Sequence, residues 1–117
     1  MKPVCIKQVC IEAEIADSAP KQAKGLMFRE GLSDKKGMFF IFDKEDKYAF
    51  WMKNMQFALD IIWINQDKEI VDINTNVPPC GTSCENIIPR EKSRYVLEVS
   101  AGFVERNQIK IGDSVSF

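Results

Sequence analysis

Apolar and polar residues follow two different patterns along this chain. Val9, Ile11, Ala13 and Ile15 alternate with Cys10 and acidic residues, which is the period of a half-buried strand. Residues 38–42 are continuously apolar, which predicts a strand buried on both faces. We expect the remaining strands at residues 48–53, 59–65, 69–75, 94–99 and 114–117.

Helix and turn signals occupy the segments between these strands. Ser18 and Pro20 are typical of a helix start and Gly25 of a helix end, which predicts a short helix over residues 18–24. A second short helix is expected at residues 100–106, capped by Ser100. Residues 43–47 should form a charged loop.

The 76–93 loop is long for a small domain, and loops of that length are often functional. About seven short strands and two short helices predict a mainly β fold. We expect a single domain over residues 1–117, built as a β-sandwich or a partly closed barrel.

Charge and hydropathy exclude several classes of partner. Sixteen basic and 17 acidic residues give a net charge of −1, with no basic block of the kind that nucleic-acid binding requires. No apolar run approaches the length of roughly 20 residues that a transmembrane segment needs. The N-terminus lacks a signal sequence, so we expect a cytoplasmic protein, or an exported one whose leader was removed.

The sequence offers few candidate catalytic residues. The chain has no His, which removes the commonest general base and metal ligand. It also lacks nucleophile-elbow, phosphate-loop and dinucleotide-binding motifs. We therefore expect no metal and no cofactor.

Residues 50–54 are the stretch most typical of a binding site. In a strand, Trp51 and Lys53 would share one face, where stacking and charge could hold an anionic or aromatic ligand, with Asn54 beside them. The alternative is structural, with the aliphatic stem of Lys53 covering Trp51.

Three charged residues lie among large apolar ones: Arg29, Asp60 and Glu98. Because buried charges are usually paired, we expect an Arg29–Asp60 or Arg29–Glu98 ion pair. The same three residues are the candidates for acid–base catalysis.

Cys80 and Cys84 would close a small ring around Gly81 if they were oxidised. Their spacing differs from the Cys-x-x-Cys of redox enzymes, and free thiols remain an equal alternative. A four-thiolate zinc site with Cys5 and Cys10 is less favoured, because residues five apart in one strand point to opposite faces.

Several of these segments together resemble the domain of unknown function 192 family, which is widespread in prokaryotes. The matching pieces are Gly25-Leu26-Met27-Phe28-Arg29, Gly37-Met38-Phe39-Phe40, Phe50-Trp51-Met52-Lys53-Asn54, Leu59-Asp60-Ile61, Pro79-Cys80, Tyr95-Val96-Leu97-Glu98 and Ala101-Gly102-Phe103, with Asp17 and Pro20 before them. The resemblance covers the chain from about Val9 onward and implies a mainly β, sandwich-like fold with no assigned activity. The chain departs from the family pattern at Glu85, where a Pro would be expected after the second Cys.

Two functions remain open. The first is a non-enzymatic binding module for a small ligand or a partner peptide, with Trp51, Lys53, Asn54 and the Cys80–Cys84 loop at its site. The alternative is an acid–base enzyme, a hydrolase or transferase, that uses Asp60, Glu98 and Arg29.

Overall fold

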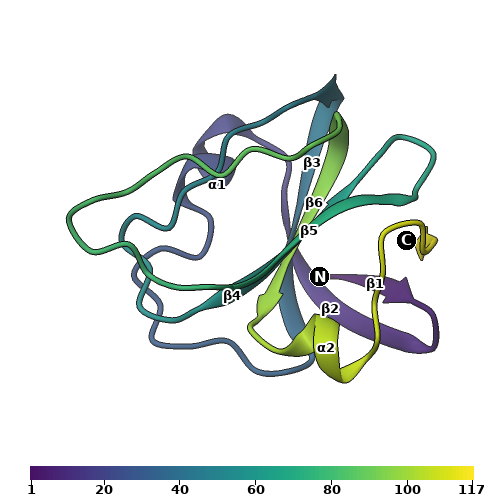
Figure 1. Cartoon of the computed structure of the whole chain (residues 1–117), viewed down its shortest axis with the longest axis horizontal. Helices are drawn as coiled ribbons and strands as arrows, with labels where there is room; N and C mark the ends of the chain where they lie inside the picture. Colours follow the sequence, from purple (N-terminus) through teal and green to yellow (C-terminus); the bar gives the residue numbers. More distant parts are fainter.

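One curled sheet of seven strands forms the body of the molecule in the computed structural model, which describes residues 1–117 (Figure 1). The strands are β1 (Lys2–Ile6), β2 (Val9–Ala16), β3 (Lys36–Asp46), β4 (Leu59–Ile64), β5 (Ile70–Val77), β6 (Ser93–Ser100) and β7 (Val115–Ser116). The helices are α1 (Ala19–Lys24) and α2 (Phe103–Arg106). The predicted mainly β fold, with about seven strands and two short helices, is confirmed. Neither helix has the length and apolar character needed to cross a membrane.

The two edges of the sheet meet at one end. The strand order is β5-β4-β6-β3-β2-β1-β7, and only the β2–β3 pair is parallel. At the start of β5, Glu69 bridges Ser114, and the amide of Val115 donates to the carbonyl of Lys68 at 2.8 Å. The sheet therefore closes on itself at one end only, so of the two predicted architectures it is the partly closed barrel.

The central strands are buried on both faces and contribute to two separate cores. The inner core fills the barrel beneath α2 and includes Phe39, Ile62 and Leu97. The outer core lies on the opposite face and includes Phe40, Trp63 and Val96. All six residues of β4 are buried. In β3, burial on both faces was predicted for residues 38–42, and it holds for residues 38–40, whereas Ile41 and Phe42 are half-buried.

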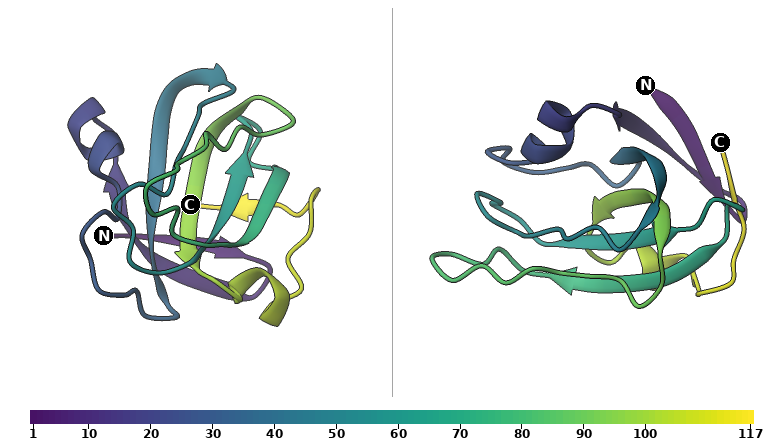
Figure 2. Two further views of the ribbon diagram at one scale, coloured as in Figure 1. Left: turned by 60° about the vertical axis from the view of Figure 1, so that its left-hand side comes forward. Right: turned by 90° about the horizontal axis from the view of Figure 1, so that it is seen from above.

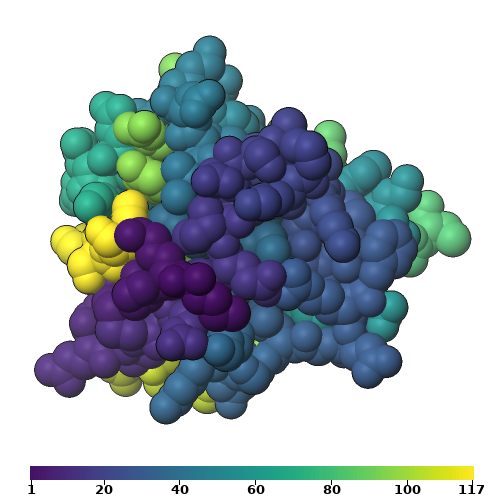
Figure 3. All heavy atoms as spheres, turned by 180° about the vertical axis from the view of Figure 1, so that it is seen from behind, coloured from purple at the N-terminus to yellow at the C-terminus, as the bar shows by residue number.

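The outer core is covered by α1 and by three long connections. Because β2 and β3 are parallel, residues 17–35 must cross over the sheet, and they carry α1 with them. The side-chain amide of Gln22 donates to the carbonyls of Ala16 and Ile41, which fixes α1 to the sheet. In Figure 2 the connections around residues 30, 55 and 85 extend from the same end of the sheet, away from both termini. Figure 3 shows how much of the rear face the N-terminal third of the chain covers.

Two predicted segments differ in the structure. The prediction of a strand at residues 48–53 is wrong, because only Phe50 of this segment forms a β-bridge, with Ile87. The segment is a loop whose Phe50 and Met52 side chains pack onto the outer core, and this imitates strand alternation. Residues 43–46, predicted as loop, continue β3 because Asp46 pairs with Ser93.

The first two cysteines lie on separate strands rather than on one. The chain turns at Lys7, which has a φ of 55°, so Cys5 and Cys10 face one another across the β1–β2 hairpin. They form a disulfide with Cα atoms 4.0 Å apart. The assumption of one continuous strand through both residues was wrong.

Asp60 links three parts of the fold through its carboxylate. Although it is fully buried, it accepts hydrogen bonds from the amides of Asn76 (2.8 Å), Gly102 (3.2 Å) and Val104 (2.9 Å). It thereby caps α2 in place of the expected Ser100, whose hydroxyl instead donates to the carbonyl of Leu32. A buried carboxylate that is fully hydrogen-bonded in this way is structural.

We predict that Asp60→Asn lowers the free energy of unfolding by about 2–4 kcal/mol, because an amide cannot accept all three backbone bonds. Urea unfolding measures the change, and Asp17→Asn on the exposed surface provides the control, with an expected change below about 0.5 kcal/mol. Equal stability of Asp60→Asn and the unchanged protein would contradict the structural role.

Candidate functional site

A cavity of about 270 Å³ lies between α1, β3, β6 and the loop that follows β3. Ten of its 14 lining residues are hydrophobic. The lining consists of Gln22, Ala23, Lys24, Gly25, Leu26, Met27, Phe40, Phe42, Tyr48, Ala49, Phe50, Trp51, Met55 and Glu98. Its size is near the lower end of small-molecule pockets, which span roughly 300–1,000 Å³.

Local sequence features shape the walls of this cavity. Ser18 caps α1, and Gly25 ends it with a φ of 49°, a backbone conformation that favours glycine. The chain then passes over the ring of Phe40 without a side chain in the way. On the other wall, the amide of Phe50 donates to Ile87 at 2.9 Å and anchors the loop that carries Tyr48 and Trp51.

Glu98 is the acidic residue in the cavity. It lies on β6 between Met38 of β3 and Ile61 of β4, and only 5% of its surface is exposed. Its carboxyl group makes no hydrogen bond and no ion pair within the protein. Burial raises the pKa of Glu98 to about 8, since a charged carboxylate is poorly solvated among apolar side chains.

The basic groups near the cavity lie at its edge. Lys24 lines the cavity from the exposed end of α1, and the ammonium of Lys53 lies 5.0 Å from the centre of the Trp51 ring. Tyr48 donates its hydroxyl proton to the carbonyl of Lys44 at 2.5 Å. Burial, together with nearby Asp46 and Asp43, raises the pKa of Tyr48. No basic group neutralises Glu98.

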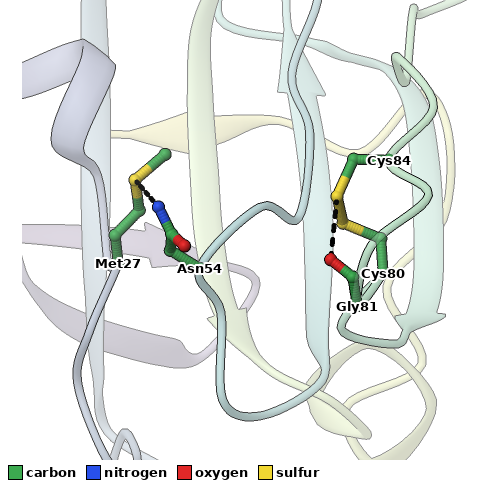
Figure 4. The surroundings of a disulfide bond; sticks show 5 residues. All are labelled: Met27, Asn54, Cys80, Gly81 and Cys84. Carbon is green, nitrogen blue, oxygen red and sulfur yellow. Dashed lines mark hydrogen bonds between the residues drawn. A yellow bond between two sulfur atoms is a disulfide. The ribbon is translucent and has the colours of Figure 1, made fainter.

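Two non-glycine residues with left-handed backbone conformations stand beside the cavity. Phe28 has a φ of 67° and Asn54 a φ of 61°, and the amide of Phe28 donates to the carbonyl of Asn54 at 2.9 Å. Figure 4 shows the side chains of Met27 and Asn54 pointing toward one another, with the Asn54 amide nitrogen 3.8 Å from the Met27 sulfur. Phe28 nevertheless remains 64% exposed. Strained backbone and an exposed aromatic residue are typical of functional surfaces.

The ligand-binding residues expected from the sequence occupy different places. Trp51 lines the cavity and is 44% exposed at its edge. Lys53 is exposed, and its ammonium group lies over the Trp51 ring. Asn54 joins two loops rather than lining the cavity. The binding role of these three residues remains a prediction.

The expected ion pair of Arg29 with Asp60 or Glu98 is wrong. Arg29 instead makes a bidentate ion pair with Glu14 of β2, and both side chains are about half-exposed. The guanidinium lowers the pKa of Glu14 and the carboxylate raises that of Arg29, chiefly through this hydrogen bonding. Asp60 lies on the inner face of the sheet with its backbone partners, whereas Glu98 faces the outer core. The three candidates for acid–base catalysis are therefore not brought together.

The Cys80–Cys84 pair forms a disulfide with Cα atoms 5.1 Å apart (Figure 4). The Cys84 sulfur also lies 3.7 Å from the carbonyl oxygen of Gly81. Cys80 packs against the outer core, and Asp72 holds the other end of this loop by accepting from the amide of Arg90 at 2.8 Å. The loop thus braces Ile87, and through it the cavity wall.

Sequence reasoning missed the aromatic and methionine lining of the cavity. Phe40 and Phe42 lie in the run predicted to be buried, and they gave no separate signal of a cavity because burial and cavity lining require the same residue types. The available signal was Glu98 itself, an acidic residue within the mainly apolar segment 95–99.

Comparison with known proteins places this chain in a family. The family model DUF192, described as Uncharacterized ACR, matches residues 3–117. The chain is 26% identical over 113 residues to a UPF0127 protein from Pyrococcus furiosus, covering 95% of this chain and 90% of that protein. It is 28% identical over 111 residues to a UPF0127 protein from Pyrococcus horikoshii, covering 91% and 87%.

A solved structure of a protein of unknown function from Novosphingobium aromaticivorans is similar over 98% of this chain and 84% of that chain. Its TM-score is 0.92, with 34% sequence identity. The match spans almost every residue described above, including both walls of the cavity. The chain therefore belongs to the DUF192 family, whose curated members carry the name UPF0127.

Proposed function

We propose that this chain is a non-enzymatic binding module whose cavity holds a small organic molecule. The molecule has a largely apolar body that fits against the rings of Phe40, Phe42 and Phe50, and one polar group that meets Glu98. The observation that carries the proposal is a carboxyl group buried in an apolar cavity without any partner from the protein.

An unpaired buried carboxyl is costly, and the fold gains nothing from it. A carboxyl group buried without a hydrogen-bond partner is costly even when it is protonated, and its charged form would cost more still. Asp60 and Asp72, the other buried acids, both bind backbone amides, so this protein pairs buried carboxyls where they serve structure. The exception at Glu98 supports a role in binding, because sites for ligands often trade stability for function.

The acid–base enzyme has weaker support. Of Asp60, Glu98 and Arg29, only Glu98 faces the cavity, and the other two are engaged elsewhere. The surrounding lining offers no nucleophile paired with a base, which acyl or phosphoryl transfer would require. A net charge of −1 likewise lends no support to nucleic acid as the partner.

We predict that Glu98→Gln removes a pH-dependent loss of stability. Between pH 4.5 and about 8 the folded protein keeps a proton on Glu98 that the unfolded chain has released. The stability of the unchanged protein should therefore fall as pH rises through this interval, by roughly 3–5 kcal/mol from this group. Urea unfolding at pH 4.5, 6 and 8 measures it.

In these measurements the free energy of unfolding of Glu98→Gln should exceed that of the unchanged protein most at pH 8 and least at pH 4.5. Glu85→Gln, on the exposed loop, is the matched control and should follow the unchanged protein throughout. Parallel stability curves for Glu98→Gln and the unchanged protein would show that the carboxyl is not a buried, unpaired group.

We predict that filling the cavity abolishes ligand binding without unfolding the protein. Ala49 lines the cavity but is exposed, so Ala49→Phe adds a ring at the entrance and removes nothing from the core. Ala19→Phe, on the exposed start of α1 outside the cavity, is the control of equal size change. Fragment screening by amide chemical shifts, with native mass spectrometry for retained molecules, reads out binding.

Fragments bound by the unchanged protein should shift the amides of Gly25, Trp51 and Glu98, and Ala49→Phe should lose these shifts while Ala19→Phe keeps them. A library whose hits perturb only other surfaces, or hits that Ala49→Phe retains, would refute the cavity as the binding site.

A further inference from the structure

The cavity is lined by a contiguous group of aromatic rings. Phe42 stacks on Tyr48 with ring centres 3.7 Å apart, and Phe50 meets Phe40 edge-on at 4.9 Å. Phe42 and Phe50 are themselves 6.3 Å apart at an interplanar angle of 76°, which makes the group continuous. Trp51 extends it to the edge of the cavity. Aromatic faces carry partial negative charge, so a group of rings around a cavity attracts cations.

The acidic group lies in the same cavity. Glu98 of β6 lines it together with these rings, and every neighbour in strand register with Glu98 is apolar, namely Met38 and Ile61. The charged and titratable groups that face the cavity from the other elements are Lys24 of α1 and Tyr48 of the loop after β3. Neither is bonded to Glu98, and Lys53 lies on the ring of Trp51. No basic group of the protein therefore pairs with the Glu98 carboxyl in the cavity.

The cation that suits these walls is bulky and weakly hydrated. A bare ammonium or metal ion needs several oxygen ligands to replace its water, and the cavity offers only one carboxyl group. A quaternary ammonium group carries its charge on methyl groups that pack against rings and methionines. A volume of about 270 Å³ accommodates such a group with a short attached chain.

Building on the proposed function, we propose that the cavity binds a small quaternary ammonium compound, held between the aromatic rings and the carboxylate of Glu98. Binding breaks the O–H bond of the Glu98 carboxyl, and the proton passes to solvent. The cation then pairs with the carboxylate of Glu98. Because the raised pKa of Glu98 keeps this proton in place at neutral pH when the cavity is empty, uptake of the cation releases about one proton.

The test is calorimetric titration at pH 7 with choline and with its neutral isostere, 3,3-dimethylbutan-1-ol. The two molecules have the same shape and differ in the charge of one central atom. We expect choline to bind at least about tenfold more tightly. Repeating the titration in buffers of different ionisation enthalpy should show about one proton released for choline and none for the isostere.

Two variants separate the contributions of charge and rings. Glu98→Gln should abolish proton release and reduce the preference for choline, while the isostere binds as before. Trp51→Leu keeps an apolar side chain at the edge and should weaken choline but not the isostere. As a control, Lys92→Gln removes an exposed lysine outside the cavity and should leave choline binding unchanged.

Equal affinity for choline and the isostere without proton release would overturn the cation proposal and leave the cavity as a site for neutral molecules. Failure of both to bind would also overturn it, and the fragment screen then judges the binding function separately. Choline binding that survives Glu98→Gln unchanged, with its proton release, would place the cation elsewhere.

Discussion

The pairing of β6 with both β3 and β4 determines where the acidic group of this molecule lies. Hydrogen bonding on both sides leaves β6 no freedom to rotate or slip, and the register sets Glu98 between Met38 and Ile61. A slip of one residue would move Glu98 from the outer face, where the cavity lies, to the inner core. The Glu98 carboxyl is therefore held at the outer face of the sheet, where it lines the cavity.

The cavity around that carboxyl is made from irregular segments that the sheet positions. The parallel pairing of β2 and β3 requires a crossover, and the crossover supplies α1 and the strand-like path through Gly25 and Met27. The loop after β3 supplies the opposite wall, fixed by the bridge between Phe50 and Ile87. The disulfide at Cys80 and the Asp72 hydrogen bonds brace the outer loop. The regular structure thus holds the acid, while bracing interactions hold the rings against it.

Local sequence signals predicted the fold well, because strand periodicity, helix caps and turn residues act over short distances. Capping by Ser18 and the apolar run of β3 are examples. The site was harder, since it depends on partners distant in sequence. The residues near Arg29 in the sequence do not indicate that its partner is Glu14. Those near Asp60 do not indicate that its carboxylate accepts hydrogen bonds from backbone amides at a distant helix. The loop at residues 48–53 imitated a strand because alternate side chains face a core.

We expect Glu98 to hold a proton at neutral pH in the ligand-free protein, because its carboxyl group lies in an apolar cavity without a partner. The most direct test is the pKa of Glu98 itself, from the carbon-13 chemical shift of the side-chain carboxyl followed by NMR between pH 4 and 10 with the unchanged protein. We expect a titration midpoint near 8, and loss of that signal in Glu98→Gln confirms its assignment. A midpoint near 4.5, the ordinary value of a glutamate, would contradict it.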